Sequence, residues 1–152
     1  LHERYLCREK AVELLARREH SSAELKRKLL QREFGTEIVE QVLQEMRDKE
    51  WLDDERFARI YAETRLRRKP TGENKLAEEL LRKGVPRAIL ERTVKEYCTE
   101  EYQRRAVEEA AQKVLRRVGK NREKLLRGLQ NRGFGMDVIR RCSVFQQLDG
   151  EK

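Results

Sequence analysis

The sequence predicts an all-α protein built from three tandem copies of a three-helix unit, on the strength of three observations. Strong helix formers dominate the chain, and only two prolines and eight glycines interrupt it. Apolar residues recur at helical spacing almost throughout. The same apolar pattern also returns at a period of about fifty residues, which is typical of repeat proteins. We therefore expect three three-helix repeats, at residues 1–51, 52–101 and 102–152, that form an elongated, curved array.

The repeat is carried by five positions in each copy. A shift of 51 residues leads from the first copy to the second, and a shift of 49 leads from the second to the third. In each copy the first two positions lie four residues apart and so do the last two, which predicts two consecutive amphipathic helices. The three sets are Leu25, Leu29, Phe34, Ile38 and Val42; Leu76, Leu80, Val85, Ile89 and Thr93; and Leu125, Leu129, Phe134, Val138 and Cys142.

A short turn separates these two helices in each copy. Gly84 and Gly133 share one turn position and suit the left-handed residue that ends a helix, while Pro86 suits the first turn of the helix that follows. Glu33 fills the same position in the first copy, which leaves the geometry of the first turn open.

Capping residues mark the expected helix starts. Ser21 with Glu24 predicts a capping box, in which a hydroxyl and a carboxylate satisfy free backbone N–H groups. Thr36 and Asn121 are predicted to cap the helices that follow them.

Each helix pair is preceded by a further amphipathic helix, which brings the expected total to nine. The apolar face of this helix is predicted from residues at helical spacing. The three faces consist of Cys7, Ala11, Leu14 and Leu15; of Phe57, Ile60, Tyr61 and Thr64; and of Val107, Ala110, Ala111, Val114, Leu115 and Val118.

Composition favours small modules over one large core. Apolar residues make up 38% of the chain and charged residues 42%, against roughly 45–50% and about 25% in average globular domains. A unit of about fifty residues buries only a marginal core, so neighbouring copies are expected to stack.

The chain carries no signal for a membrane or for export. No stretch approaches the roughly 18 apolar residues of a membrane span, and the first ten residues lack the apolar core of a signal peptide. We therefore expect a cytoplasmic protein, and because the chain begins at Leu1 we expect an initiator methionine to precede it. Cys7, Cys98 and Cys142 are far apart and lie on apolar faces, which predicts reduced thiols in the core.

No motif indicates catalysis or a cofactor. His2 and His20 lack a ligand partner at helical spacing, and no glycine-rich phosphate loop, nucleophile elbow or zinc motif is present. The sequence therefore predicts a protein that is not an enzyme, with no cofactor and no metal.

The densest carboxylate group is Asp53-Asp54-Glu55. Adjacent carboxylates hold Mg²⁺ in some nucleases. Here they open a helix, where acidic residues cap free N–H groups and meet the positive end of the helix dipole. We therefore interpret Asp53 and Asp54, like Ser21, as structural caps, with a nuclease as the remote alternative.

The net charge of +8 is concentrated in the third copy. Residues 102–152 hold 13 basic and 6 acidic side chains, whereas the first copy holds 11 and 11 and the second 12 and 11. Clustered cations favour phosphate contacts, so the excess predicts a polyanion or an acidic protein surface as partner. The alternative for any single Lys or Arg is that its charge only keeps the protein soluble. The candidate binding residues form two clusters, Arg65, Arg67, Arg68 and Lys69, and Lys113, Arg116, Arg117, Lys120, Arg122, Lys124 and Arg127.

The last two helices of each copy also resemble a helix-turn-helix, which raises the possibility of a transcription factor. Charge in the first copy argues against this function. Residues 37–48, the would-be recognition helix, contain four carboxylates against Arg47 alone, and the phosphates that line the major groove would repel them. Sequence-specific reading of DNA by all three copies is therefore not expected.

Five segments of the sequence occur in an order and at a spacing that are typical of one known family. They are Leu14-Leu15-Ala16-Arg17-Arg18-Glu19-His20-Ser21, Glu24-Leu25 with Lys28-Leu29, Trp51-Leu52-Asp53-Asp54 with Arg56-Phe57-Ala58, Glu79-Leu80-Leu81-Arg82-Lys83-Gly84-Val85, and Arg132-Gly133-Phe134. In these segments the sequence resembles the RecX family, the regulators of the bacterial recombinase RecA, over nearly its whole length. It departs from the family at Glu33, where glycine is common.

This resemblance implies a non-enzymatic regulator that binds RecA filaments on single-stranded DNA, usually inhibiting ATP hydrolysis and strand exchange. We expect a monomer that does not bind membranes, whose near-neutral first two copies contact the filament and whose basic copy approaches DNA or an acidic filament surface. Several weak contacts would then act together. The alternative is a stand-alone helical nucleic-acid-binding protein without a recombinase partner, and retention of RecA after nuclease treatment would separate the two.

Overall fold

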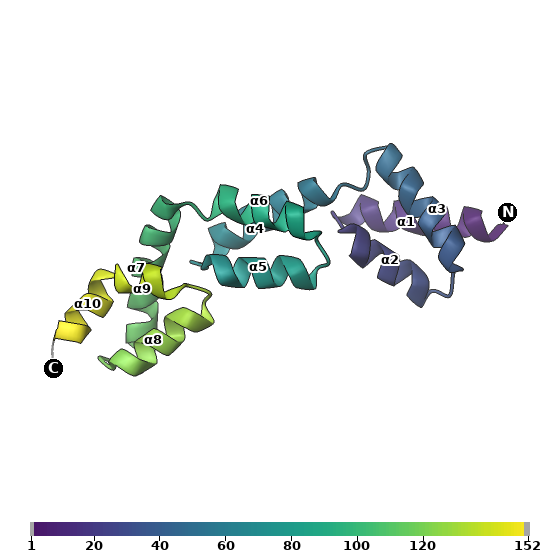
Figure 1. The fold of residues 1–152 in the computed structure, drawn as a ribbon. Helices are drawn as coiled ribbons and strands as arrows, with labels where there is room; N and C mark the ends of the chain where they lie inside the picture. Colours follow the sequence, from purple (N-terminus) through teal and green to yellow (C-terminus); the bar gives the residue numbers. More distant parts are fainter. Residues whose placement is uncertain (1, 151–152) are drawn as a thin grey trace. The chain divides into compact units, whose positions relative to one another are not determined.

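The structure, a computed structural model, describes residues 2–150, and these form ten α-helices and no strand (Figure 1). The all-α prediction is confirmed. The helices are α1 (His2–Arg17), α2 (Ser22–Gln31), α3 (Thr36–Asp48), α4 (Asp54–Arg68), α5 (Glu73–Arg82), α6 (Arg87–Tyr97), α7 (Glu100–Val118), α8 (Arg122–Asn131), α9 (Met136–Arg140) and α10 (Ser143–Gly150).

Helices α1, α2 and α3 pack on one another around a single apolar core (Figure 1). Leu25 and Leu29 of α2 and Val42 of α3, three of the predicted repeat positions, are fully buried in it. Cys7 and Ala11 supply the buried face of α1. Burial of apolar surface stabilises a fold by roughly 25 cal/mol per Å². This free energy holds together three helices that are too short to be stable alone.

Of the caps predicted at Ser21, Thr36 and Asn121, two are present. The capping box is present, since Ser21 Oγ accepts a hydrogen bond from the Glu24 N–H at 3.1 Å and the Glu24 carboxylate accepts one from the Ser21 N–H at 3.2 Å. The Asn121 side chain likewise accepts a hydrogen bond from a first-turn N–H of α8 at 3.0 Å. The prediction for Thr36 is wrong, because α3 begins at Thr36 and the residue at the N-cap is Gly35.

The apolar face predicted for α4 is wrong in two of its four positions. Ile60 is 43% exposed and Thr64 is exposed, whereas Ala58 and Ala62 are fully buried beside Phe57. Small side chains on this face allow another element to approach the α4 backbone closely. The 51-residue shift indicated these positions, because it carries the buried Cys7 and Ala11 of α1 onto Ala58 and Ala62.

Helices α7, α8, α9 and α10 share a second apolar core. The expected count of nine helices is wrong, because the third copy ends in two helices, α9 and α10, where one was expected. The chain turns at Arg141 and Cys142. The Glu108 carboxylate of α7 then accepts hydrogen bonds from the Ser143 N–H at 2.6 Å and from its hydroxyl at 2.7 Å, which satisfies a free donor at the start of α10.

Two compact units can be distinguished in the chain, residues 1–60 with 80–90 and residues 61–79 with 91–152. The second copy contributes to both, since its α5–α6 turn belongs to the first unit and its α4–α5 turn to the second. The division into repeats at residues 51 and 101, and their elongated, curved arrangement, stay predictions.

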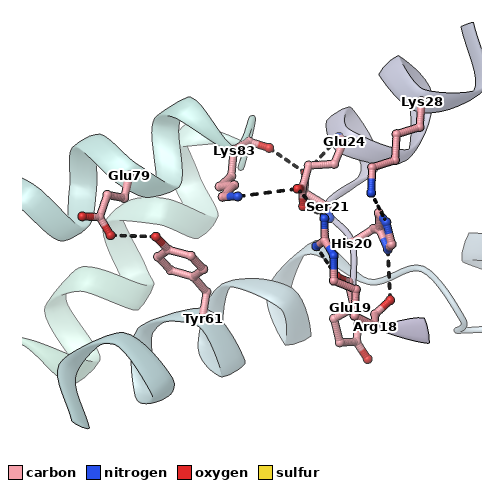
Figure 2. A network of polar contacts seen from close by, with 9 residues as sticks. All are labelled: Arg18, Glu19, His20, Ser21, Glu24, Lys28, Tyr61, Glu79 and Lys83. Carbon is pink, nitrogen blue, oxygen red and sulfur yellow. Dashed lines mark hydrogen bonds and ion pairs between the residues drawn. The ribbon is translucent and has the colours of Figure 1, made fainter. Parts of the chain in front are cut away.

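In the first unit, the start of α2 sits on the α5–α6 turn (Figure 2). The Ser21 hydroxyl donates a hydrogen bond to the Lys83 carbonyl at 2.6 Å, and the Lys83 ammonium lies 3.7 Å from the buried Glu24 carboxylate. A Cβ atom on Gly84 would collide with the Ala23 side chain. The turn can therefore meet the helix start only because residue 84 is glycine.

In the second unit, the start of α5 sits on the α8–α9 turn in the same way. The Gly72 and Asn74 N–H groups donate to the carbonyls of Arg132 at 2.8 Å and Gly133 at 3.0 Å. A Cβ atom on Gly133 would collide with Lys75, and one on Gly72 would collide with the Gly133 backbone. Shifts of 51 and 49 residues superimpose this contact on the one between Ser21 and Lys83, so the junction is itself repeated.

The three turns have one backbone geometry. Residue φ values are 67° at Glu33, 81° at Gly84 and 91° at Gly133, all left-handed, and the N–H of each donates to the carbonyl three residues earlier at 2.9 Å. The first turn, whose geometry the sequence left open, therefore matches the other two, with Glu33 in a conformation that glycine adopts more easily.

Alanine at residue 84 should destabilise the protein by more than about 2 kcal/mol. A left-handed backbone costs a residue with a Cβ roughly 1–2 kcal/mol, and the collision with Ala23 adds to this cost. Urea unfolding measures the change in free energy. Glu33→Ala is the matched control, expected within about 0.5 kcal/mol of the parent because residue 33 already has a Cβ. Equal effects of the two substitutions would contradict the close contact at Gly84.

A buried histidine lies beside the first junction (Figure 2). Its Nδ1 lies 3.0 Å from the Arg18 carbonyl, and its Nε2 lies 2.8 Å from the Lys28 ammonium, which makes Nδ1 the donor and Nε2 the acceptor. Burial lowers the pKa of His20, and the charges of Arg18 and Lys28 lower it further. His20 is therefore neutral in the folded protein at neutral pH.

Stability should fall as the solution is acidified below about pH 6.5, where an unfolded histidine takes up a proton. The folded-state pKa of His20 lies below that value. The contribution of neutral His20 to the free energy of unfolding is therefore complete above about pH 6.5, and it is lost as the pH falls through the folded-state pKa. One proton gives a slope of at most about 1.4 kcal/mol per pH unit. Urea unfolding between pH 7 and 5 measures it, and His20→Asn should remove this part of the slope. An unchanged slope in the variant would contradict the assignment.

Candidate functional site

The second unit contains a groove of about 820 Å³ whose lining is strongly basic. We call it the basic groove. Residues near the C-terminal ends of α4 and α7 line it, together with the α4–α5 loop, the start of α5, and α8. The lining residues are Arg65, Lys69, Pro70, Thr71, Lys75, Lys113, Val114, Arg117, Val118, Lys124, Arg127, Gly128, Asn131 and Arg132.

Eight of the lining residues are cationic and none is acidic. Among the described residues, Arg117, Lys124 and Arg127 have no ion pair. Lys113 does have one, at 3.8 Å from Glu109. A groove lined by one sign of charge concentrates the opposite charge within it, so this surface suits a polyanion.

One wall of the groove is held in place by a polar network around Glu79 of α5. Arg65 of α4 donates to the two carboxylate oxygens of Glu79 at 2.9 and 3.2 Å and to the Thr71 hydroxyl at 3.0 Å. The Tyr61 hydroxyl donates to Glu79 at 2.6 Å (Figure 2). The Arg65 charge is thus paired with Glu79 within the protein, and its hydrogen bond to Thr71 orients the α4–α5 loop.

Protonation states in this network follow from burial and hydrogen bonding. Burial opposes ionisation of Glu79, but the hydrogen bonds from Arg65 and Tyr61 outweigh it, and the pKa of Glu79 lies below its usual value. Burial, with the hydrogen bond to Glu79, raises the pKa of Tyr61 to about 12. At neutral pH the carboxylate is charged and the phenol protonated, so the network is a fixed anchor for Arg65.

Six of the eleven cations singled out from the sequence line the basic groove. The structure thus brings parts of the two sequence clusters onto one surface. The six are Arg65, Lys69, Lys113, Arg117, Lys124 and Arg127.

The other five predicted cations lie outside the groove lining. Arg67 lies 3.2 Å from Glu63 on its own helix, and the Arg122 guanidinium lies 4.7 Å from the centre of the Phe145 ring. Arg68, Arg116 and Lys120 are exposed on the surface. An exposed ion pair such as that of Arg67 with Glu63 contributes little to stability.

Sequence reasoning missed two cations of the groove, Lys75 and Arg132. Neither belongs to a run of basic residues. They meet in space because Gly72 and Gly133 allow the α5 start to touch the α8–α9 turn. The two glycines are the signal that would have found them, since close backbone approach requires residues without a side chain.

The predicted carboxylate caps differ in what they cap. The Asp53 carboxylate accepts a hydrogen bond from the Arg56 N–H at 3.1 Å, within the start of α4. The Asp54 carboxylate instead accepts one from the Ser22 N–H at 2.7 Å, and so caps α2. In the described part of the chain, no group of three or more histidines, cysteines and acidic residues is arranged to hold a metal ion.

All three cysteines are buried and free, as expected. Burial raises the pKa of Cys7 to about 11 and that of Cys98 to about 12, so these thiols are protonated at neutral pH. A membrane-crossing helix is likewise not found among the described residues.

Taken together, the all-α fold, the repeated glycine junction and the basic groove define a helical-repeat protein with a cationic surface groove. Comparison with known proteins identifies the family. Residues 7–49 match the first three-helix domain of RecX, and residues 53–94 match the second.

Relatives and solved structures agree with this match. The regulatory protein RecX of Chlorobium limicola is 41% identical over 131 residues, covering 86% of this chain and 82% of that protein. RecX of Treponema pallidum is 38% identical, covering 87% and 80%. The crystal structure of RecX from Lactobacillus salivarius has the same fold, with a TM-score of 0.85 at 20% identity over 97% of both chains. The chain therefore belongs to the RecX family of regulatory proteins, and membership of this family implies regulation of RecA.

Proposed function

We propose that this protein inhibits RecA by binding RecA filaments on single-stranded DNA, and that the basic groove contacts the phosphate backbone there. It restrains ATP hydrolysis and strand exchange as a monomer, without catalysing a reaction and without a cofactor. The observation that carries the proposal is the lining of the groove, which holds eight cations and no carboxylate. Clustered Lys and Arg side chains supply most of the affinity of proteins for nucleic-acid backbones.

The chemistry of the groove favours the backbone over the bases. Among the described residues that line it, none is aromatic, so bases find no side chain on which to stack. The apolar lining residues, Pro70, Val114 and Val118, are too small to replace such a platform. Contacts limited to phosphates position a protein on nucleic acid and carry no sequence information. A regulator that binds filaments on any sequence requires this kind of recognition.

The first copy, with the part of the second copy outside the basic groove, supplies the protein contacts in this proposal. The first copy holds 11 basic and 11 acidic side chains, so it is suited to a mixed protein surface and not to a phosphate backbone. A filament presents the same RecA surface many times. Linked modules that bind neighbouring protomers gain effective concentration, so that individually weak contacts give firm binding.

Removal of three unpaired cations from the groove should weaken inhibition. The triple variant Arg117→Ala, Lys124→Ala and Arg127→Ala loses contacts to phosphates, so more protein is needed to inhibit RecA-catalysed ATP hydrolysis on single-stranded DNA. The slope of log DNA affinity against log salt concentration should also become shallower by about 2, because each phosphate contact on a single strand contributes roughly 0.7 to that slope.

A matched variant separates groove contacts from total charge. Arg68→Ala, Arg116→Ala and Lys120→Ala removes the same charge from exposed positions outside the groove. This variant should keep most of its inhibition and its salt slope. Equal losses in the two triple variants would reject the groove as the binding surface, and full inhibition by the groove variant would reject the proposed role of DNA contacts.

A further inference from the structure

One residue of the segment between α3 and α4 has a position that the fold does not explain. Leu52 is buried in the core of the first three helices. The Asp53 carboxylate caps the start of α4, and the Asp54 carboxylate caps the start of α2. Trp51, the only tryptophan in the sequence, is instead 45% exposed. A large aromatic side chain that stays in water, although its burial would stabilise the fold, favours contact with another molecule.

Hydrogen bonds hold the backbone of Trp51 on both sides. Its N–H donates to the Met46 carbonyl at 2.9 Å, and the left-handed Glu50 before it, with a φ of 60°, turns the chain out of α3. The Arg56 guanidinium donates to the carbonyls of Glu50 at 2.9 Å and of Trp51 at 3.2 Å. The Glu19 carboxylate accepts a hydrogen bond from Arg56 Nε at 2.8 Å and so orients the guanidinium. This backbone is therefore ordered before any partner binds.

The indole ring is positioned by a neighbouring side chain. The Lys49 ammonium lies 4.8 Å from the centre of the ring, and it lies 3.6 Å from the Glu45 carboxylate one turn earlier on α3. A side chain that is placed before binding loses less conformational entropy when a partner covers it. Tryptophan within a ring of polar groups is also enriched at the energetic centres of protein interfaces. Trp51 has both properties.

The charge around Trp51 indicates the kind of partner. Residues 48–56 carry five carboxylates, at positions 48, 50, 53, 54 and 55, against the two cations Lys49 and Arg56. Both cations are already paired with carboxylates of this protein. Such a segment repels phosphates and attracts a basic protein surface. A base that stacked on Trp51 would bring its phosphates against these carboxylates, so the charge favours a protein partner over a nucleic acid.

We propose that Trp51 is the anchor by which the first copy binds the protein surface of the RecA filament, in an apolar pocket bordered by basic side chains. This inference rests on the proposed function and assigns its protein contact to one residue. The two surfaces then have separate tasks. The basic groove binds phosphates, and Trp51, on an acidic segment, binds a protein surface of opposite charge.

Binding of Trp51→Ala to RecA filaments assembled on oligo(dT) tests this proposal. Removal of an anchor at the centre of an interface should weaken filament binding by at least about 30-fold. Leu81→Ala is the control, because Leu81 is 60% exposed in the same unit, and it should weaken binding by less than about threefold. Urea unfolding establishes that both variants are folded. A loss no larger in Trp51→Ala than in Leu81→Ala would overturn the proposal.

Fluorescence of the unmodified protein separates a protein contact from base stacking. Because Trp51 is the only tryptophan, its emission reports on this site alone when free oligo(dT) is added. A base that stacks on an indole quenches its emission. Oligo(dT) should therefore leave the emission unchanged, and Trp51→Ala should bind oligo(dT) as tightly as the parent. Quenching, or weaker binding of oligo(dT) by the variant, would show a nucleic-acid contact and refute the protein anchor.

A charge variant tests the nature of the partner surface. Asp48→Asn with Glu50→Gln removes two carboxylates near Trp51 and leaves the ring in place. Filament binding should weaken severalfold at low salt and change little at high salt, because salt screens the attraction to basic side chains. Tighter filament binding by this variant would mean an acidic partner surface, against the proposal.

The anchor and the proposed function fail in different ways. If Trp51→Ala binds filaments like the parent while the groove variant Arg117→Ala, Lys124→Ala and Arg127→Ala loses inhibition, only the anchor is wrong. If the parent protein itself does not bind RecA filaments, the proposed function is refuted and the anchor with it.

Discussion

The architecture depends on one contact, in which the start of a helix rests directly on the backbone of a glycine turn. Two polar chain segments meet there with few side chains between them, and hydrogen bonds to the carbonyls of Lys83, Arg132 and Gly133 replace those that water would supply. The contact requires close approach of the two backbones, and a side chain on the glycine would prevent it. It therefore fixes which segments are neighbours, while the apolar cores supply most of the stabilising free energy.

The basic groove is a consequence of the second of these contacts. The hydrogen bonds from Gly72 and Asn74 hold the α4–α5 loop against the α8–α9 turn. The Thr71 N–H also donates to the Tyr102 hydroxyl of α7 at 3.2 Å, which fixes the loop from the other side. Cations from α4, the loop and α5 then face those of α7 and α8. Like charges are held close together here because the backbone contact offsets their repulsion.

The sequence was sufficient to predict the helices of the first two copies and most of the core, because the buried positions recur in every copy. Leu25, Leu76 and Leu125 are fully buried at one repeat position, and Leu29, Leu80 and Leu129 at the next. It was less informative where small residues take the buried face. Ala58 and Ala62 carry little hydrophobic signal, so the bulkier Ile60 was chosen wrongly although it is exposed.

The groove could be predicted only in part, because it joins residues that are distant in sequence. Runs of Lys and Arg identified candidates on α4, α7 and α8, but a run does not show which of its members face one surface. Arg116 and Arg117 are neighbours in the chain, yet only Arg117 lines the groove, as successive residues on a helix point about 100° apart. Lys75 and Arg132 required knowledge of the junction itself.

Amide hydrogen exchange at Gly72 and Asn74 tests the junction most directly. Both N–H groups precede or begin α5 and donate to carbonyls of the α8–α9 turn, so no bond within their own helix protects them. If the junction holds the second unit together, they exchange as slowly as the Leu125 N–H at the start of α8. Exchange at the rate of an open loop, while Leu125 stays protected, would show that the helix start does not rest on the turn and would contradict the account.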